Sequence, residues 1–377
     1  MTRDLKIRRA KKKDLGRLVE IEHRTFTTDV LSRRSFRHFI LPGAHDLRVA
    51  LIDAEIAGYV LVLYRPGTSL ARMYSIAVAP EHQGKGIASR LMAVAEEAGR
   101  EHLCSFMRLE VDVNNTPART LYEKLGYRGV GKIEGYYEDG SDALQMEKQI
   151  YSGPPRKEIT APYYEQTTDF SCGPAALMMA MKTLEPGYQM TRREELQIWR
   201  EATTIFMTSG HGGCSPHGLA LSAWSRGFDV DMYINRHGAP FVDGVRDPDK
   251  KAVVELVHED FVARIEDTGI RLHLQDIKPE QLRSFLEEGK TLVTLISTWR
   301  LNRNKAPHWV FAAGADENFV YINDPDISDR PWQSETDYIR VPIGIQEFID
   351  MACFGRSRLR CVLVLDKRSS RKKAVKK

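Results

Sequence analysis

The segment "DFSCGPAAL", residues 169–177, places a cysteine at the start of a run of small apolar residues. Pro174 follows two positions later, and proline suits the first turn of a helix because the N–H groups of that turn lack intrahelical partners. We therefore expect Cys172 at the positive end of a helix dipole, which favours the thiolate and nucleophilic chemistry. The alternative is packing, because free cysteines are commonly buried and inert.

A cysteine nucleophile needs a base and a group that orients the base, and both can lie far away in the sequence. His308 begins one predicted strand and Asp324 ends the next, so a hairpin would bring both residues to the same end of a sheet. Gln166 lies six residues before Cys172, near enough to act as an oxyanion donor together with the cysteine's own N–H. Taken singly, His308 is also consistent with a core residue and "NDPD" with a turn.

The pattern "QTTDFSCGPAAL", followed by "HWVFAAG" and "INDPD", resembles the papain-like cysteine peptidases that process bacteriocin leader peptides after double-glycine motifs. The resemblance covers residues 160–366 and implies that Gln166 is the oxyanion donor of a triad formed by Cys172, His308 and Asp324. Unlike those peptidases, which usually precede a transporter, the chain has no membrane helices, and its segment 185–290 is long and charged. We predict thiol-dependent amide hydrolysis; its specificity stays open, as does acyl transfer or ligation from the same thioester.

A second group of residues with chemical potential lies in "VAPEHQGKGIA", residues 78–88. Gln83, Gly84 and Gly86 stand where a predicted strand turns into a helix, and free N–H groups at a helix N-terminus bind phosphate oxygens. The loop has neither the three-glycine Rossmann spacing nor the Lys-Ser/Thr ending of a P-loop. A plain turn between strand and helix is the alternative.

Together with "LEVDVNNTPARTLYEKLGY", this unit resembles the GNAT acetyltransferases, most of all those that acetylate protein N-termini, such as ribosomal-protein alanine acetyltransferases. The resemblance spans residues 5–149 and implies that the loop binds the acetyl-CoA pyrophosphate and that the preceding strand contacts the pantetheine arm. The implied acetyl-CoA contacts are Ile76, Ala77, Val78, Gln83, Gly84, Lys85, Gly86, Ile87, Ala88 and Asn115.

Acetylation of an amine requires a base, because the amine must lose a proton before it attacks the thioester. Glu110, at the end of a predicted strand, is the candidate base, acting directly or through water, and Tyr122 is the candidate acid for the departing thiolate. Without the resemblance, Glu110 would be interpreted as a solvated strand residue and Tyr122 as a core residue.

The elements that position these residues follow from hydrophobic periodicity. The first 150 residues alternate strand-like and helix-like segments, with apolar residues on one face of a helix at Ile87, Leu91, Ala95 and Ala98. We predict an α/β GNAT fold, a mixed central sheet flanked by helices, followed by an α+β papain-like peptidase fold whose helices precede its strands. The expected boundaries are 1–150 and 161–366 for the domains, 151–160 for a linker and 367–377 for a basic disordered tail.

Composition limits the remaining possibilities. The chain has 377 residues, of which 42% are apolar, which suits two or three domains, and no apolar run approaches the roughly 20 residues that cross a bilayer. Five cysteines without close spacing indicate free thiols and a cytoplasmic protein. The net charge is +4, and the tail alone carries seven basic residues. We interpret the tail as a solubilising end, with ribosome or nucleic-acid contact as the alternative.

The segment "GHGGCSPHG" invites a zinc interpretation, with His211, Cys214 and His217 spaced three residues apart. Structural zinc usually takes four ligands, and no fourth is near, so we predict no metal. The glycines favour a loop that borders the peptidase groove, with Ser215-Pro216 starting a helix.

The complete prediction is a cytoplasmic bifunctional enzyme that acetylates an amine, expected to be a peptide or protein N-terminus, and hydrolyses a peptide bond. Neither the substrate nor the order of the two reactions follows from the residues. One alternative is an active acetyltransferase joined to a non-catalytic papain-like module that binds peptides. Another is a non-enzymatic ribosome- or nucleic-acid-binding protein regulated by acetyl-CoA.

Overall fold

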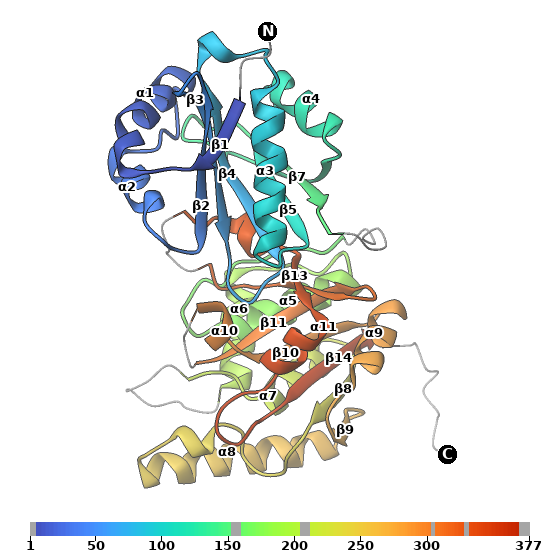
Figure 1. Ribbon diagram of the computed structural model, residues 1–377. Coiled ribbons are helices and arrows are strands. Elements are labelled where there is room, and N and C mark those ends of the chain that lie inside the picture. The colour runs from blue at the N-terminus through green and yellow to red at the C-terminus, as the bar shows by residue number, and fades with distance from the viewer. Residues whose placement is uncertain (1–4, 152–159, 204–211, 303–305, 328–331, 369–377) are drawn as a thin grey trace. The chain divides into compact units, whose positions relative to one another are not determined.

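The computed structural model describes residues 5–151, 160–203, 212–302, 306–327 and 332–368. The chain divides into two compact units, Met1–Arg156 and Lys157–Lys377, which are described separately (Figure 1). Each unit is built around a seven-stranded sheet.

The sheet of the first unit has the strand order β1-β2-β3-β4-β5-β7-β6 and is antiparallel except between β4 and β5. Its strands are β1 Leu5–Arg9, β2 His45–Ile52, β3 Glu55–Tyr64, β4 Leu70–Val78, β5 Phe106–Asp112, β6 Arg128–Ile133 and β7 Ala143–Gln149. The helices are α1 Leu15–Thr25, α2 Arg33–Ile40, α3 Ile87–Glu101 and α4 Thr116–Lys124. Helix α3 packs on β2 to β5, and α1 packs on β3 and β4.

The amphipathic pattern predicted for α3 is confirmed, because its four apolar positions are all buried. The sheet beneath this helix opens between its two parallel strands. Strands β4 and β5 pair only from Leu70 to Arg72 and from Phe106 to Arg108, although both run on for several residues. The last residues of β4, Ile76–Val78, are therefore paired to β3 but not to β5 within the described part of the chain.

The sheet of the second unit has the order β13-β12-β11-β10-β14-β8-β9, and only β8 and β9 are parallel. Its strands are β8 Phe228–Ile234, β9 Arg271–Leu274, β10 Thr291–Ser297, β11 Pro307–Ala315, β12 Phe319–Asn323, β13 Val341–Gly344 and β14 Cys361–Lys367. The helices are α5 Cys172–Leu184, α6 Arg192–Ala202, α7 Pro216–Ser225, α8 Pro248–Glu266, α9 Pro279–Glu287, α10 Trp299–Asn302 and α11 Ile345–Met351.

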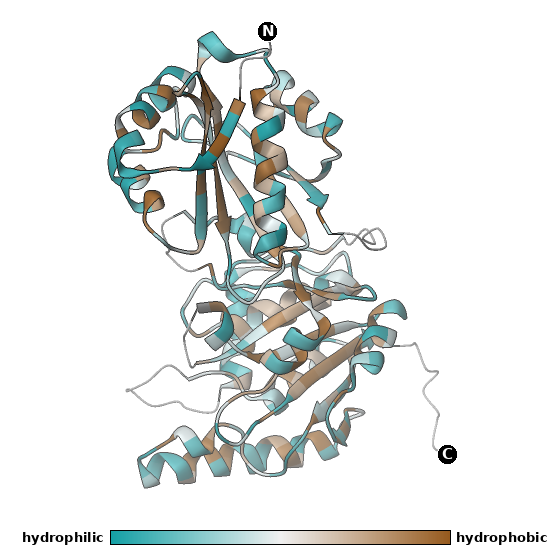
Figure 2. Cartoon of the chain, in the orientation of Figure 1, coloured by the Kyte–Doolittle hydropathy of each residue, from teal (hydrophilic) through white to brown (hydrophobic). Residues whose placement is uncertain are grey.

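Both faces of this second sheet carry a hydrophobic core. Along β10, Val293 and Leu295 join the cluster that includes α5, α6 and α7, whereas Leu292 and Ile296 join the cluster on the α9 and α11 side. Successive strand residues point to opposite faces, so a strand covered on both faces is apolar throughout. The brown strands of Figure 2 show this pattern. Helix α5 is buried from Gly173 to Met181, which explains why its sequence lacks a polar face.

Three expectations about the second unit need correction or qualification. The strands do not all come late, because β8 and β9 lie between α7 and α9; the polar alternation of "FDVDMYI" concealed β8. Two residues of the expected tail are held by the second unit, because Lys367 belongs to β14 and Arg368 donates hydrogen bonds to the carbonyl oxygens of Trp224 and Phe228. Residues 152–159 of the expected linker and 369–377 of the tail lie outside the described residues. In the described chain, no helix combines the length and apolar character needed to span a membrane.

Candidate active sites

The loop between β4 and α3 requires its two glycines for backbone reasons. Gly84 and Gly86 both have φ of +73°, a left-handed conformation that side chains disfavour. A Cβ at either position would meet no atom within 4 Å, so the backbone angle rather than crowding selects glycine. Helix α3 starts directly after Gly86.

The N–H groups of residues 84–89 donate no hydrogen bond to any residue that the structure describes. They lie at the positive end of the 15-residue helix α3, where the dipole and the free donors both favour an anion. The arrangement is suited to a phosphate or pyrophosphate group. Next to it, Gln83 donates its side-chain amide to the carbonyl oxygen of Val78 at 3.2 Å, which ties the loop to the end of β4.

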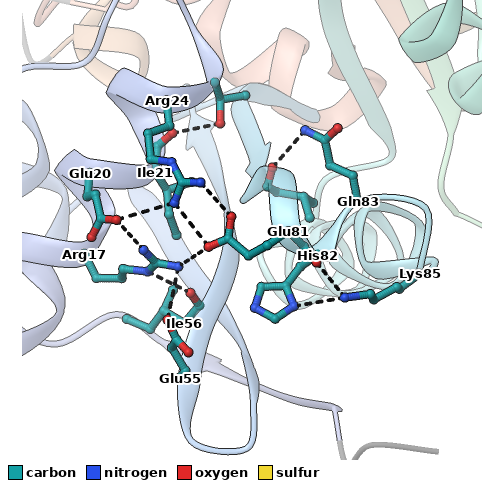
Figure 3. Close-up of polar contacts among 12 residues, drawn as sticks. Arg17, Glu20, Ile21, Arg24, Glu55, Ile56, Glu81, His82, Gln83 and Lys85 are labelled. Carbon is teal, nitrogen blue, oxygen red and sulfur yellow. Dashed lines mark hydrogen bonds and ion pairs between the residues drawn. The ribbon is translucent and has the colours of Figure 1, made fainter.

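Glu81 fastens the same loop to helix α1 (Figure 3). Its carboxylate accepts hydrogen bonds from Arg17 at 2.8 Å and Arg24 at 2.9 Å. Its own backbone N–H and the two guanidinium groups lower the pKa of Glu81 to about 2. Lys85 turns back to the carbonyl oxygen of Glu81 at 2.6 Å, so its ammonium group also stays beside the loop. Glu81, Arg17 and Arg24 were not predicted as site residues from the sequence.

Glu110 is a buried partner of a buried arginine rather than a solvated strand residue. Its Oε2 atom lies 2.8 Å from Nε of Arg72, and the side chains are only 4% and 3% exposed. Arg72 also donates to the hydroxyl of Tyr136 at 2.7 Å. The second carboxylate oxygen, Oε1, is buried and has no hydrogen-bond partner among the described residues. A buried acceptor without a donor is costly, so this oxygen is suited to accept from an amine or a water.

Tyr122, on α4, is buried, and burial raises the pKa of its phenol above the usual value. The phenol is therefore protonated at neutral pH, as a proton donor must be. Asn115 is the N-cap of the same helix and accepts the N–H of Ala118 at 3.2 Å. The structure thus gives Asn115 a capping role; contact with acetyl-CoA stays a prediction.

In the second unit, the β11–β12 hairpin brings His308 and Asp324 together. Nε2 of His308 lies 2.7 Å from Oδ1 of Asp324, and both residues are buried. Burial alone would lower the pKa of His308, but the charges and hydrogen bonds of Asp324 and Cys172 raise it well above the usual value. Since Asp324 occupies Nε2, the other ring nitrogen is left for Cys172. The imidazolium form is favoured, which suits a thiolate–imidazolium pair.

Cys172 is the first residue of α5 and is partly exposed. Gly173 explains how the start of this helix reaches the strand that carries His308. A Cβ on Gly173 would lie 3.1 Å from Leu219, 3.2 Å from Trp309 and 3.3 Å from Cys214, all side-chain atoms. Only glycine therefore fits without displacing its neighbours. Burial raises the pKa of the Cys104, Cys214 and Cys361 thiols, which makes them poor nucleophiles.

Gln166 lies beside the segment that contains Asp324. Its backbone N–H donates to the carbonyl oxygen of Pro325 at 2.9 Å, and its side-chain amide donates to Oδ1 of Asp326 at 3.3 Å. The side-chain oxygen is buried without a partner among the described residues. The side chain thus bonds to Asp326, and the oxyanion role of Gln166 stays a prediction.

The structure does not describe all three residues that were considered as zinc ligands. His211 lies outside the described residues, and no group of three or more possible ligands occurs in the part that is described. His217 packs against His258 with ring centroids 4.7 Å apart, and burial lowers the pKa of His217 to about 3. The predicted helix start is confirmed, because Pro216 begins α7 and Ser215 accepts the N–H of His217.

Sequence reasoning also missed Arg72 and Glu195. Arg72 interrupts the apolar strand "LARMYSIAV", and a charged residue in a buried strand signals a partner. Glu195 offered no such signal, because it lies in the charged helix "RREELQIWREA".

Comparison with known proteins assigns each of the two units to a protein family. Residues 15–127 match the acetyltransferase (GNAT) family model, and residues 161–366 match the model described as a Peptidase_C39 like family. An N-alpha-acetyltransferase of Saccharolobus solfataricus is 31% identical over 159 residues, which cover 39% of this chain and 95% of the relative. A putative [ribosomal protein bS18]-alanine N-acetyltransferase of Bacillus subtilis is 34% identical, over 37% of this chain and 92% of the relative.

Among solved structures, the ribosomal-protein-S18-alanine N-acetyltransferase of Escherichia coli is similar at 22% identity and a TM-score of 0.37, covering 41% of this chain and 99% of that chain. The chain belongs to the GNAT acetyltransferases through its first unit and to the Peptidase_C39 like family through its second.

Proposed function

We propose that the first unit transfers an acetyl group from acetyl-CoA to an amine, and that this amine is the N-terminus of a peptide or protein. The single observation that carries the acetyl-CoA site is the row of free N–H groups from residue 84 to residue 89 at the start of α3. The names of the similar N-alpha-acetyltransferase and bS18-alanine acetyltransferase support the choice of an N-terminal amine.

Each residue then has a defined task. The free N–H groups hold the pyrophosphate, and Ile76–Val78, which β5 leaves unpaired, line the pantetheine arm. Oε1 of Glu110 takes the proton of the amine, directly or through water, as nitrogen attacks the thioester carbonyl. When the carbon–sulfur bond breaks, the Tyr122 phenol protonates the leaving thiolate.

Acetyl-CoA binding tests this site without knowledge of the acceptor. Acetyl-CoA at 100 times its Kd should stabilise the first unit by about 2.7 kcal/mol, seen as a raised melting temperature. Gly86→Val should abolish the shift, whereas Gly16→Ala, at an open position in the same unit, should keep it. No shift in the wild type would refute the proposal. Mass spectrometry of peptides incubated with the enzyme would then identify the acetylated amine.

We propose that the second unit hydrolyses a peptide bond with Cys172 as nucleophile, His308 as base and acid, and Asp324 as the group that orients His308. The observation that carries it is the buried 2.7 Å hydrogen bond between His308 and Asp324 at a histidine whose pKa Cys172 also raises. The thiolate attacks the carbonyl carbon, His308 protonates the leaving amine, and water activated by His308 hydrolyses the thioester. Cleavage after a double glycine stays a prediction from the family resemblance.

Alkylation by iodoacetamide tests the nucleophile, with Cys353, also partly exposed, as the internal comparison. At neutral pH Cys172 should react well before Cys353, and His308→Ala should remove most of this advantage. Equal rates at the two cysteines would refute the hydrolase and favour a non-catalytic module that binds peptides.

A further inference from the structure

Besides Asp324, a second buried carboxylate lies next to the segment that leads into Cys172. Glu195, on α6, is completely buried. It accepts the Tyr164 hydroxyl at 3.0 Å, the Thr167 N–H at 2.8 Å, the Thr167 hydroxyl at 2.6 Å and the Ser171 hydroxyl at 2.6 Å. No lysine, arginine or histidine of the described chain forms an ion pair with it.

The four donors belong to a single short segment, residues 164–171, that leads into Cys172. Thr167 directly follows Gln166, and Ser171 directly precedes Cys172. One carboxylate therefore holds the neighbours of both residues that would bind the oxyanion. The Ser171 backbone N–H donates to the carbonyl oxygen of Thr168 at 3.3 Å, which closes the intervening turn.

Gln166 itself is held by the chain around Asp324. The carbonyl oxygen of Pro325 accepts its backbone N–H, and Asp326 accepts one hydrogen of its side-chain amide. A primary amide carries two hydrogens, so one is left to donate elsewhere. Burying a carboxylate is costly unless donors surround it, and a neutral side chain would fill the space at lower cost. Glu195 is fully buried and has no cationic partner among the described residues, so its presence at this position indicates a role that a neutral residue does not perform.

We propose that Glu195 is a positioning residue that sets the Gln166 amide and the Cys172 N–H as the oxyanion donors of the second unit. The inference rests on the proposed hydrolase function. It predicts that loss of the carboxylate impairs attack on a carbonyl, which builds negative charge on oxygen, more than attack on a saturated carbon.

Two reagents distinguish attack on a carbonyl from attack on a saturated carbon by the same sulfur atom, that of Cys172. With p-nitrophenyl acetate, the thiolate forms a bond to the carbonyl carbon through an oxyanion, and p-nitrophenolate leaves. With iodoacetamide, the thiolate displaces iodide without an oxyanion. Glu195→Gln in the full-length protein should slow acylation of Cys172 by about 10²-fold, the usual cost of losing an oxyanion donor, and alkylation by no more than about threefold.

The matched control is Glu194→Gln, because Glu194 is the neighbour on the same helix but accepts from Tyr188 and Arg226, away from residues 164–171. It should change neither rate by more than about twofold. Gln166→Ala should reproduce the selective loss of acylation, and adding Glu195→Gln to it should cost little more, because both changes disable one donor set.

Ser171→Ala supplies a milder variant should Glu195→Gln fail to fold. The Ser171 hydroxyl makes no capping hydrogen bond to α5, so this change removes one donor to Glu195 and leaves the helix start intact. The same preference for alkylation over acylation is expected, at a smaller ratio. Equal losses in both rates, tracking the melting temperature, would overturn the positioning role. A wild type whose Cys172 reacts no faster than Cys353 would refute the hydrolase itself, and with it this inference.

Discussion

His308 and Asp324 lie 16 residues apart in the chain, yet Nε2 of the first is 2.7 Å from Oδ1 of the second in the interior of the second unit. Such a pair orients the imidazole and stabilises its charged form, and the pKa of His308 is raised accordingly, by Asp324 and by Cys172. The pair makes the reactivity of Cys172 depend on a residue that does not take part in bond formation.

Asp324→Asn should therefore narrow the pH range in which Cys172 reacts. The reactive pair needs a protonated His308, so in the wild type it persists with rising pH up to the raised pKa of His308. Without the charge of Asp324 that pKa falls, and the upper limit of the range moves to lower pH. The pH profile of peptide hydrolysis, in which His308 must protonate the leaving amine, measures the limit, and an unchanged limit would contradict the role assigned to Asp324.

Gly173→Ala should destabilise the second unit by about 1–3 kcal/mol, because the added methyl group crowds Leu219, Trp309 and Cys214. It should also slow alkylation of Cys172, since relief of the crowding moves the start of α5 away from His308. Gly213→Ala is the matched control, because a Cβ there meets nothing within 4 Å. All five tryptophans lie in residues 199–332, so their fluorescence reports unfolding of this unit.

Glu110→Gln should lower kcat for acetyl transfer by about 10²–10⁴-fold, because the amide cannot take a proton from the amine. The stabilisation by acetyl-CoA should remain, since the loop that binds it is unchanged. Glu147→Gln is the structural comparison, because Glu147 forms a similarly buried pair with Arg108 at 2.7 Å. That variant should lose stability by about 3–5 kcal/mol, as broken buried pairs do. Equal kcat losses in the two variants, tracking stability, would exclude Glu110 as the base.

The second unit should lose stability in mild acid through His217 and His258. Burial lowers the pKa of both, that of His217 to about 3, so the unfolded chain, which binds protons below about pH 6.5, takes them up at higher pH than the folded state does. Their stabilising effect is complete above that value and is lost as the pH falls. For His217, a change from pH 7.5 to pH 5 should remove about 2 kcal/mol. Urea unfolding followed by tryptophan fluorescence should show this loss, and His217→Gln should reduce it.

Much of both sites could be predicted from local sequence. The glycine loop, the apolar face of α3 and the helix start at Cys172 each depend on residues a few positions apart, whose backbone preferences act within one turn. Hairpin geometry likewise predicts, from the sequence alone, that His308 and Asp324 lie at one end of the sheet.

Contacts between segments that lie far apart in the chain could not be predicted from local sequence. The sequence by itself determined which residues could react: Cys172, His308 and Asp324 in one unit, and Glu110 and Tyr122 in the other. Only the tertiary structure decided that Arg72 pairs with Glu110 and that Glu195 holds the segment before Cys172. A charged side chain has the same local preferences on a solvated helix as in a core, and its partner is chosen by packing across the fold.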